Sequence, residues 1–153
     1  MTSLLTPSSV PQPAPGRRDR TRARAWALQV LYRWEMESAS SDPRDALRQV
    51  LESRRVAPDR REYLERLVKT VAEHLEEIDG ALRGALENWR LERLGTVDRC
   101  ILRLSAAELL YMPDVPERVA VQEGVRLAER YGSDESAGFV NGVLDALLHR
   151  FRT

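Results

Sequence analysis

The chain has 153 residues, of which 42% are apolar and 31% charged, a globular composition that fits one domain and excludes a mostly disordered chain. No stretch approaches the roughly 18 consecutive apolar residues that span a bilayer, which excludes a transmembrane role. The net charge is zero, but the segment up to Trp34 carries six arginines against one acidic residue, and the remainder is correspondingly acidic. A polyanionic partner for this basic segment is favoured over the alternative of a solvated basic helix face. These properties predict a soluble, cytoplasmic, single-domain protein.

The N-terminal part divides into a tail and a basic helix. Residues 1–16 are rich in proline, serine and threonine and have no hydrophobic periodicity or apolar signal region, which predicts a flexible tail. From Asp19 onward an apolar stripe predicts a helix, and residues 38–41 end it. The stripe consists of Ala23, Trp26, Ala27, Val30, Leu31 and Trp34. The polar face contains Arg18, Arg22, Gln29 and Arg33. Tyr32 lies off the stripe and is therefore a candidate for partner contact.

Two helices are predicted next, each from a proline near its start. Asp42-Pro43 supplies an N-cap followed by proline at the first helical position. Pro58-Asp59, with Glu62 three residues later, predicts a variant of the capping box. The second helix is expected to continue to Ile78, and Gly80 and Gly84 predict a bend or break after it.

Three more helices are predicted in the C-terminal part. The first opens at Gly95-Thr96 and ends before Met112-Pro113, and the second runs from Pro116 to Tyr131 with Gly132 after it. The last begins near Ser136 and buries a stripe that ends at Phe151. No segment alternates like a strand, so we predict an all-α bundle of about seven helices over residues 17–153.

Signatures of catalysis are missing from the sequence. It has no glycine-rich phosphate loop and no Gly-x-Ser-x-Gly motif, and His74 and His149 lie far apart in the sequence and are interpreted as surface or helix-end histidines. The single cysteine, Cys100, lies among apolar residues and is interpreted as a small buried hydrophobe. We therefore predict no catalytic site, no metal site and no cofactor. Arginines do favour phosphate binding, because the guanidinium group stays charged and bonds phosphate with two donors.

Four blocks of sequence resemble, in order, the NusB transcription antitermination factor family. The blocks are Arg20–Arg24 leading into Ala27–Tyr32, Val97–Leu104 with Glu108-Leu109, Val115-Pro116 followed by Val119–Glu123, and Phe139–Asp145. Gln122 stands where the family usually has asparagine, and Thr21 where some relatives have arginine. The resemblance covers roughly residues 17–151. Asn141 and Gly142 within the last block are expected to serve helix packing.

The resemblance implies an all-α RNA-binding factor without catalytic activity. Such factors pair with NusE, a ribosomal protein of the small subunit, bind single-stranded boxA RNA in ribosomal RNA leaders, and join the RNA polymerase antitermination complex. Matching motifs imply RNA contacts for Arg20, Arg22, Arg24 and Gln29, and Arg17 and Arg18 extend this run. Glu135 and Phe139 match positions near the family's RNA surface and are also candidate RNA contacts. Matching positions imply NusE contacts for Tyr32, Glu92 and Asp98, which we expect to share a surface. Relatives can also self-associate, so a homodimer is a further candidate assembly.

Two alternative functions compete with this interpretation. Similar domains precede ribosomal RNA cytosine methyltransferases as RNA-recognition modules, but no nucleotide-binding region or catalytic cysteine motif follows Phe151. A helical adaptor that binds only proteins would leave the arginine-rich segment without a role.

Overall fold

The described part of the chain, residues 16–39 and 41–152 of a computed structural model, is folded mainly into helices. In chain order the elements are α1 (Arg17–Met36), α2 (Pro43–Ser53), α3 (Pro58–Glu73), α4 (Leu75–Ala85), the 3-10 turn η3 (Leu91–Arg93), α5 (Thr96–Tyr111), α6 (Glu117–Tyr131) and α7 (Ser136–Arg152). These residues contain no strand, which confirms the predicted all-α bundle. Of the predicted tail at residues 1–16, all but Gly16 lies outside the described residues.

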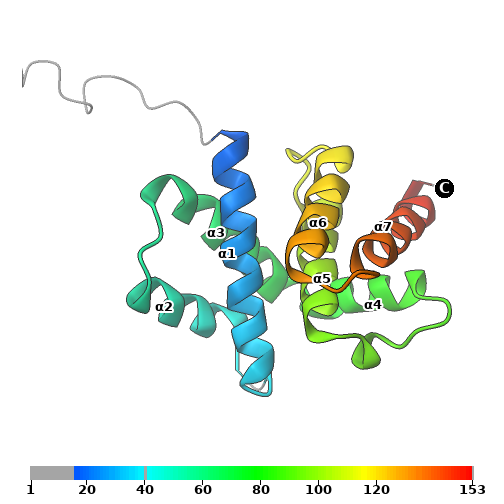
Figure 1. Ribbon diagram of the computed structural model, residues 1–153, viewed down its shortest axis with the longest axis horizontal. Helices are drawn as coiled ribbons and strands as arrows, with labels where there is room; N and C mark the ends of the chain where they lie inside the picture. Colours follow the sequence, from blue (N-terminus) through cyan, green and yellow to red (C-terminus); the bar gives the residue numbers. More distant parts are fainter. Residues whose placement is uncertain (1–15, 40, 153) are drawn as a thin grey trace, which may run out of the picture.

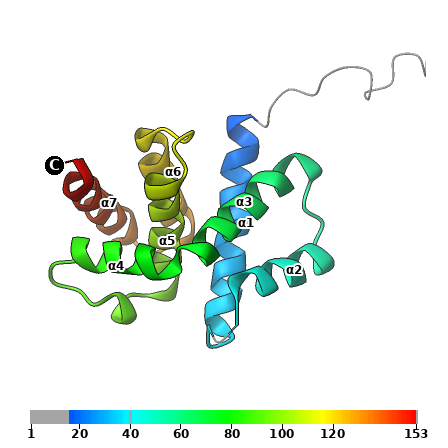
Figure 2. The same cartoon turned by 180° about the vertical axis from the view of Figure 1, so that it is seen from behind.

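Helix α5 occupies the centre of the bundle. It packs against α1, α3, α4, α6 and α7, with α1–α3 on one side of it and α4, α6 and α7 on the other (Figure 1, Figure 2). Every residue from 100 to 108 is buried, which is expected of a helix that has neighbours all around it. Cys100 is one of them, as predicted, and burial is the main reason that the pKa of its thiol rises to about 12.

Helix α1 directs its apolar stripe toward α2, α3 and α5. The buried members of this stripe are Ala23, Ala27, Val30, Leu31 and Trp34, five of the six predicted residues. They recur three and four residues apart, so they share one side of the helix. The other sides of α1 remain available for polar residues, and this arrangement positions the site described below.

Prolines mark the starts of α2 and α3, and an acidic side chain caps only α2 of these two. Asp42 accepts a hydrogen bond from the backbone N–H of Arg44 at 2.8 Å, and Pro43 is the first residue of α2, as predicted. The predicted capping box at Asp59 and Glu62 is wrong. The N-cap of α3 is Ala57, two residues before Asp59, and it makes no side-chain cap, so the helix begins at Pro58. The fixed φ of proline therefore marks this start without help from the acidic side chain.

The break between α3 and α4 lies at His74, whereas Gly80 and Gly84 both fall within α4. The imidazole of His74 stacks on the ring of Tyr111, with ring centroids 3.8 Å apart and planes 7° from parallel. Glycine in a helix costs only about 1 kcal/mol relative to alanine. Burial of neighbouring apolar side chains such as Ile78 and Leu82 outweighs that cost, so α4 continues through both glycines.

The final helix departs from the prediction at its end. Phe151 is exposed, although the apolar pattern of α7 predicted that it would be buried. Val140, Val143, Leu144 and Leu147 are buried as expected. Within the described residues, no helix is both long and apolar enough to cross a membrane.

Candidate nucleic-acid interface

The arginines at the start of α1 lie on different sides of the helix. Two residues along an α-helix correspond to a rotation of about 200°, so alternate arginines fall on opposite sides. Arg18 and Arg22 share one side, and Arg20 and Arg24 share the other. The single basic run in the sequence therefore becomes several separate environments in the structure.

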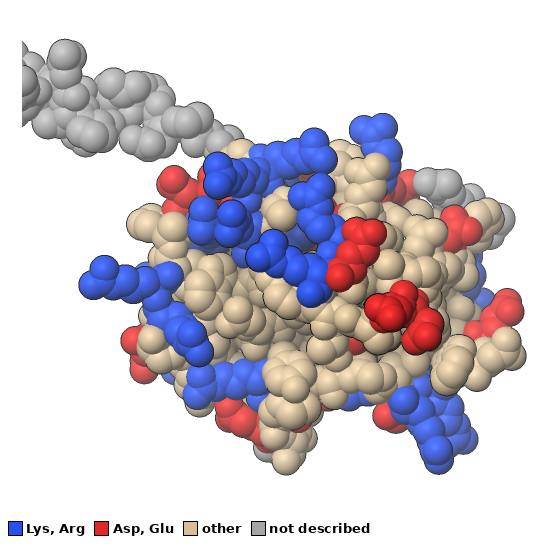
Figure 3. All heavy atoms as spheres, in the orientation of Figure 1, with Lys and Arg blue, Asp and Glu red and all other residues tan. Residues whose placement is uncertain are grey.

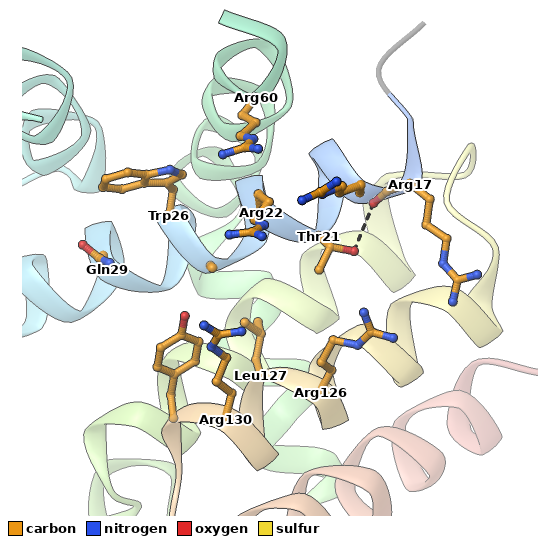
Figure 4. Close-up of a pocket in the computed structure, with 12 residues that line it drawn as sticks. Arg17, Thr21, Arg22, Trp26, Gln29, Arg60, Arg126, Leu127 and Arg130 are labelled. Atoms are coloured by element: carbon orange, nitrogen blue, oxygen red, sulfur yellow. Dashed lines mark hydrogen bonds between the residues drawn. The ribbon is translucent and has the colours of Figure 1, made fainter. Parts of the chain in front are cut away.

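Arg18 and Arg22 line a groove of about 690 Å³ between α1 and α6. Arg60 enters it from α3, and Arg126 and Arg130 enter it from α6 (Figure 4). Its full lining is Arg17, Arg18, Thr21, Arg22, Ala25, Trp26, Gln29, Arg60, Arg126, Leu127, Arg130 and Tyr131, and we call it the arginine groove. In the space-filling view the basic side chains gather over this region, near the N-terminal end of α1 (Figure 3).

Most of the positive charge in the arginine groove is not neutralised. Arg17, Arg18, Arg22 and Arg130 form no ion pair with a carboxylate of the described residues. The other two arginines are held only loosely: Arg60 lies 3.5 Å from a carboxylate oxygen of Asp19, and Arg126 lies 3.5 Å from one of Glu123. The groove therefore combines a high positive charge with guanidinium groups that are free to bind phosphate.

Aromatic and amide side chains lie among these arginines. Tyr131 is 42% exposed, and the guanidinium carbon of Arg130 lies 5.7 Å from the centre of its ring. Trp26 was predicted to belong to the core, but it is only half-buried and forms part of the groove wall. Gln29 is exposed on the next turn. Exposed rings can stack on unpaired bases and an amide can bond to their edges, so the groove suits a single strand.

Arg24 does not belong to this surface, which corrects the prediction that it contacts RNA. It is 3% exposed, and its guanidinium donates to Glu108 at 2.7 Å and to Glu123 at 2.9 Å. Tyr63 also donates its phenolic hydrogen to Glu108. Burial is the main cause that raises the pKa of Glu108, and the Arg24 charge opposes it. Arg24 thus neutralises buried acids, and almost none of its surface is exposed to a ligand.

Arg20 lies on the same side of α1 as Arg24 and is partly exposed. Its guanidinium carbon lies 4.6 Å from the centre of the Tyr63 ring, and it approaches Asp114 at 3.3 Å. Asp114 also accepts hydrogen bonds from Arg66, and these bonds are the largest cause that lowers its pKa to about 2. Arg20 therefore already has partners, and it faces away from the arginine groove.

Of the three residues predicted to contact NusE, the structure brings two together. Tyr32, which is 42% exposed, and Asp98 line one shallow groove between α1 and the start of α5. Tyr131 lines this groove as well as the arginine groove, so the two surfaces adjoin. Glu92 is not part of the lining. It pairs with Arg83 at 2.7 Å, and this hydrogen bond is the main cause that lowers its pKa.

Glu135 and Phe139 also lie outside the arginine groove. Glu135 is exposed just before α7. Phe139 is half-buried and meets Trp89 edge-on, with ring centroids 6.1 Å apart. Asn141 and Gly142 are exposed, and a Cβ added to Gly142 would meet no atom within 4 Å. The expectation that these two residues serve helix packing is therefore wrong.

Sequence reasoning missed four residues of the arginine groove: Arg60, Arg126, Arg130 and Tyr131. Arg126 and Arg130 are four residues apart, which places both on one side of α6 and was visible as a pattern. Only the packing of the bundle, however, shows that this side of α6 faces α1.

Comparisons with known proteins relate the chain to one family. The model of the NusB family matches residues 21–149. The transcription antitermination protein NusB of Sorangium cellulosum is 46% identical over 84% of this chain and 90% of its own length. The solution structure of NusB from Aquifex aeolicus has a TM-score of 0.76 at 34% identity, covering 88% of this chain and 90% of that one.

A second solved structure adds binding partners to the comparison. It is a crystal structure of the antitermination factors NusB and NusE in complex with double-stranded RNA, with a TM-score of 0.78 and 34% identity. The match covers 88% of this chain and 99% of that one. The family match along most of the chain, together with these relatives, shows that the chain belongs to the NusB family.

Proposed function

We propose that this chain is a transcription antitermination factor that binds boxA RNA of ribosomal RNA leaders together with the ribosomal protein NusE. In this role it joins the RNA polymerase antitermination complex and suppresses premature termination. It acts by binding, without catalysis, in the cytoplasm. The family membership and the related NusB–NusE–RNA structure support the role. The observation that carries the proposal is the arginine groove, with four arginines that have no carboxylate partner among the described residues.

The RNA surface consists of Arg17, Arg18, Arg22 and Gln29 of α1, with Arg60 of α3 and Arg126, Arg130 and Tyr131 of α6. Arg20 is peripheral to this surface, and Arg24 is excluded because it is buried. Guanidinium contacts to phosphate supply affinity that depends on salt, and the exposed Tyr131 ring supplies a stacking surface for an unpaired base. Glu135 and Phe139 are proposed to flank this surface rather than form it.

The RNA proposal is tested by titrating a boxA oligonucleotide against the wild type and the double variant Arg18→Ala/Arg22→Ala. We expect affinity to fall at least tenfold, about 1.4 kcal/mol. The slope of log affinity against log salt should become shallower by about 1.4, because each single-strand phosphate contact contributes about 0.7. Arg55→Ala is the matched control, since Arg55 is exposed and lies outside the groove. Unchanged affinity in the double variant would refute the site.

The NusE surface is proposed to include Tyr32 and Asp98, with Glu92 at its margin. Tyr32→Asp should impair association with NusE and leave the melting temperature near that of the wild type, because the ring is exposed. If the variant instead melts early, Tyr32 contributes to the core and this assignment fails. NusE binding that persists in a chain unable to bind boxA would favour an adaptor that binds only proteins.

Because Tyr131 lines both grooves, RNA and NusE are expected to bind cooperatively. NusE should raise boxA affinity at least tenfold, about 1.4 kcal/mol, and raise the affinity of a scrambled RNA much less. By linkage, boxA must tighten the contact with NusE by the same factor. Titrating each pair and the ternary mixture at one salt concentration measures this. Equal gains for both RNAs would mean that NusE adds only charge.

A further inference from the structure

A second basic groove lies beside the arginine groove, at the N-terminal half of α6. Its volume is about 330 Å³, and α1 and the start of α6 form its walls. The polar residues that matter most in it are Arg17, Arg20, Arg118 and Gln122. Arg118 lies outside the residues that the family resemblance assigns to RNA, and Gln122 stands where the NusB family usually has asparagine. We call this feature the α6 groove.

Positive charge dominates the α6 groove. Arg118 is exposed and forms no ion pair with a carboxylate of the described residues, and the same holds for Arg17. The acidic residue in the lining, Glu123, is already satisfied. It accepts a hydrogen bond from Thr21 and pairs with Arg24 at 2.9 Å. A negatively charged ligand would therefore meet two unpaired guanidinium groups and a neutralised carboxylate.

A line of exposed polar side chains on α6 connects the two grooves. Arg118, Gln122, Arg126 and Arg130 follow one another at intervals of four residues, and all four are exposed. Four residues advance a helix by little more than one turn, so these side chains form a single polar stripe about 18 Å long. Its first two members line the α6 groove and its last two line the arginine groove, while Arg17 lines both.

We propose that the RNA strand held in the arginine groove continues along α6 into the α6 groove, where Arg118 binds a phosphate and Gln122 bonds to a base or ribose. This inference rests on the proposed function and extends the RNA site to a second helix. Continuity of positive charge favours a polyanionic strand, whereas a short acidic peptide would need only one of the two grooves.

The test compares three RNAs that share the boxA core. One is just long enough for the arginine groove, and the other two carry an extension at the 5′ or at the 3′ end. Arg118→Ala should weaken one of the extended RNAs about threefold or more and reduce its salt slope by about 0.7, and it should leave the short RNA unaffected. Gln122→Ala should weaken the same extended RNA without changing the slope, because an amide carries no charge. Arg55→Ala again controls for loss of one exposed, unpaired positive charge.

The outcomes separate this inference from the proposed function. If Arg118→Ala and Gln122→Ala bind both extended RNAs like the wild type while Arg18→Ala/Arg22→Ala is impaired, the strand does not enter the α6 groove and the inference is wrong. If the double variant is also unimpaired, the proposed RNA site itself fails. Weaker NusE binding by Arg118→Ala, with unchanged RNA binding, would assign the α6 groove to a protein and overturn the inference.

Discussion

Replacement of the buried arginine of α1 should destabilise the fold without acting on the RNA surface directly. Arg24→Met retains most of the apolar stem and removes the charge that lies 2.7 Å from Glu108 and 2.9 Å from Glu123. After the substitution, Glu123 keeps a looser contact with Arg126 at 3.5 Å. Glu108 keeps only the hydroxyl of Tyr63. The loss of stability therefore arises mainly from Glu108, whose carboxylate is left without a cation and which is 2% exposed.

The expected loss in the free energy of unfolding follows from the burial of the ion pair between Arg24 and Glu108. Removing one partner of a buried ion pair costs about 3–5 kcal/mol, because the remaining charge stays away from water without compensation. Since Tyr63 and Arg126 relieve part of that penalty, we expect a loss of about 3–4 kcal/mol in the free energy of unfolding at pH 7. For a chain of this size the melting temperature should fall by about 10 °C. Urea denaturation monitored by circular dichroism measures both the midpoint and the slope.

The pH dependence gives a second, independent check. Without Arg24, the pKa of Glu108 in the folded state rises further above its unfolded value, because burial then acts with less opposition. The penalty is present above that folded pKa and is relieved as the pH falls through it, since the neutral acid is tolerated in the core. The difference in stability between the wild type and Arg24→Met should therefore narrow between pH 7 and pH 5.

Arg22→Ala is the matched control, two residues away on the same helix. Arg22 is exposed and has no ion pair with a described carboxylate, so its removal should change stability by less than about 0.5 kcal/mol and weaken RNA binding. Arg24→Met should show the opposite pattern when RNA affinity is measured well below its melting temperature. If Arg24→Met is as stable as the wild type at pH 7, the reasoning about buried acids is refuted.

Three further substitutions and one labelling measurement test the packing. Tyr63→Phe removes the hydroxyl that donates to Glu108 and should cost about 1–3 kcal/mol by urea denaturation; no loss would mean that this hydrogen bond is dispensable. Gly124→Ala should cost about 1–3 kcal/mol, since its Cβ would clash with the hydroxyl oxygen of Ser105 on α5, whereas Gly142→Ala should stabilise by up to about 1 kcal/mol. The Cys100 thiol, with its pKa raised to about 12 by burial, should resist a thiol reagent at pH 8 until the protein unfolds; rapid labelling of the native protein would contradict its burial.

Local sequence signals predicted the helix starts well. Proline fixes φ at its own position, so Pro43 and Pro58 mark the starts of α2 and α3 whatever the rest of the chain does. The break at His74 could not be predicted in this way. It coincides with a stacking contact to Tyr111, which lies 37 positions further along the chain and has no local signature.

The same distinction applies to the arginines. All arginines of α1 have the same local chemistry, and the sequence alone treats them as one basic run. The burial of Arg24 depends on Glu108 and Glu123, which are 84 and 99 residues away. Similarly, Arg126 and Arg130 show their spacing in the sequence, but their role in the groove depends on how α6 lies relative to α1.

Helix α1 fixes the distance and the direction between the proposed RNA surface and the proposed NusE surface. Arg18 and Tyr32 are fourteen residues apart, nearly four full turns, so they project from almost the same side at an axial separation of about 21 Å. No flexible linker intervenes between them, and the apolar stripe of α1 fixes the helix against its neighbours. An insertion of one residue between Arg22 and Gln29 would turn one end relative to the other by about 100°. Such a change would keep the residues of both surfaces in the chain, but it would turn part of the apolar stripe away from the core and misalign RNA with NusE.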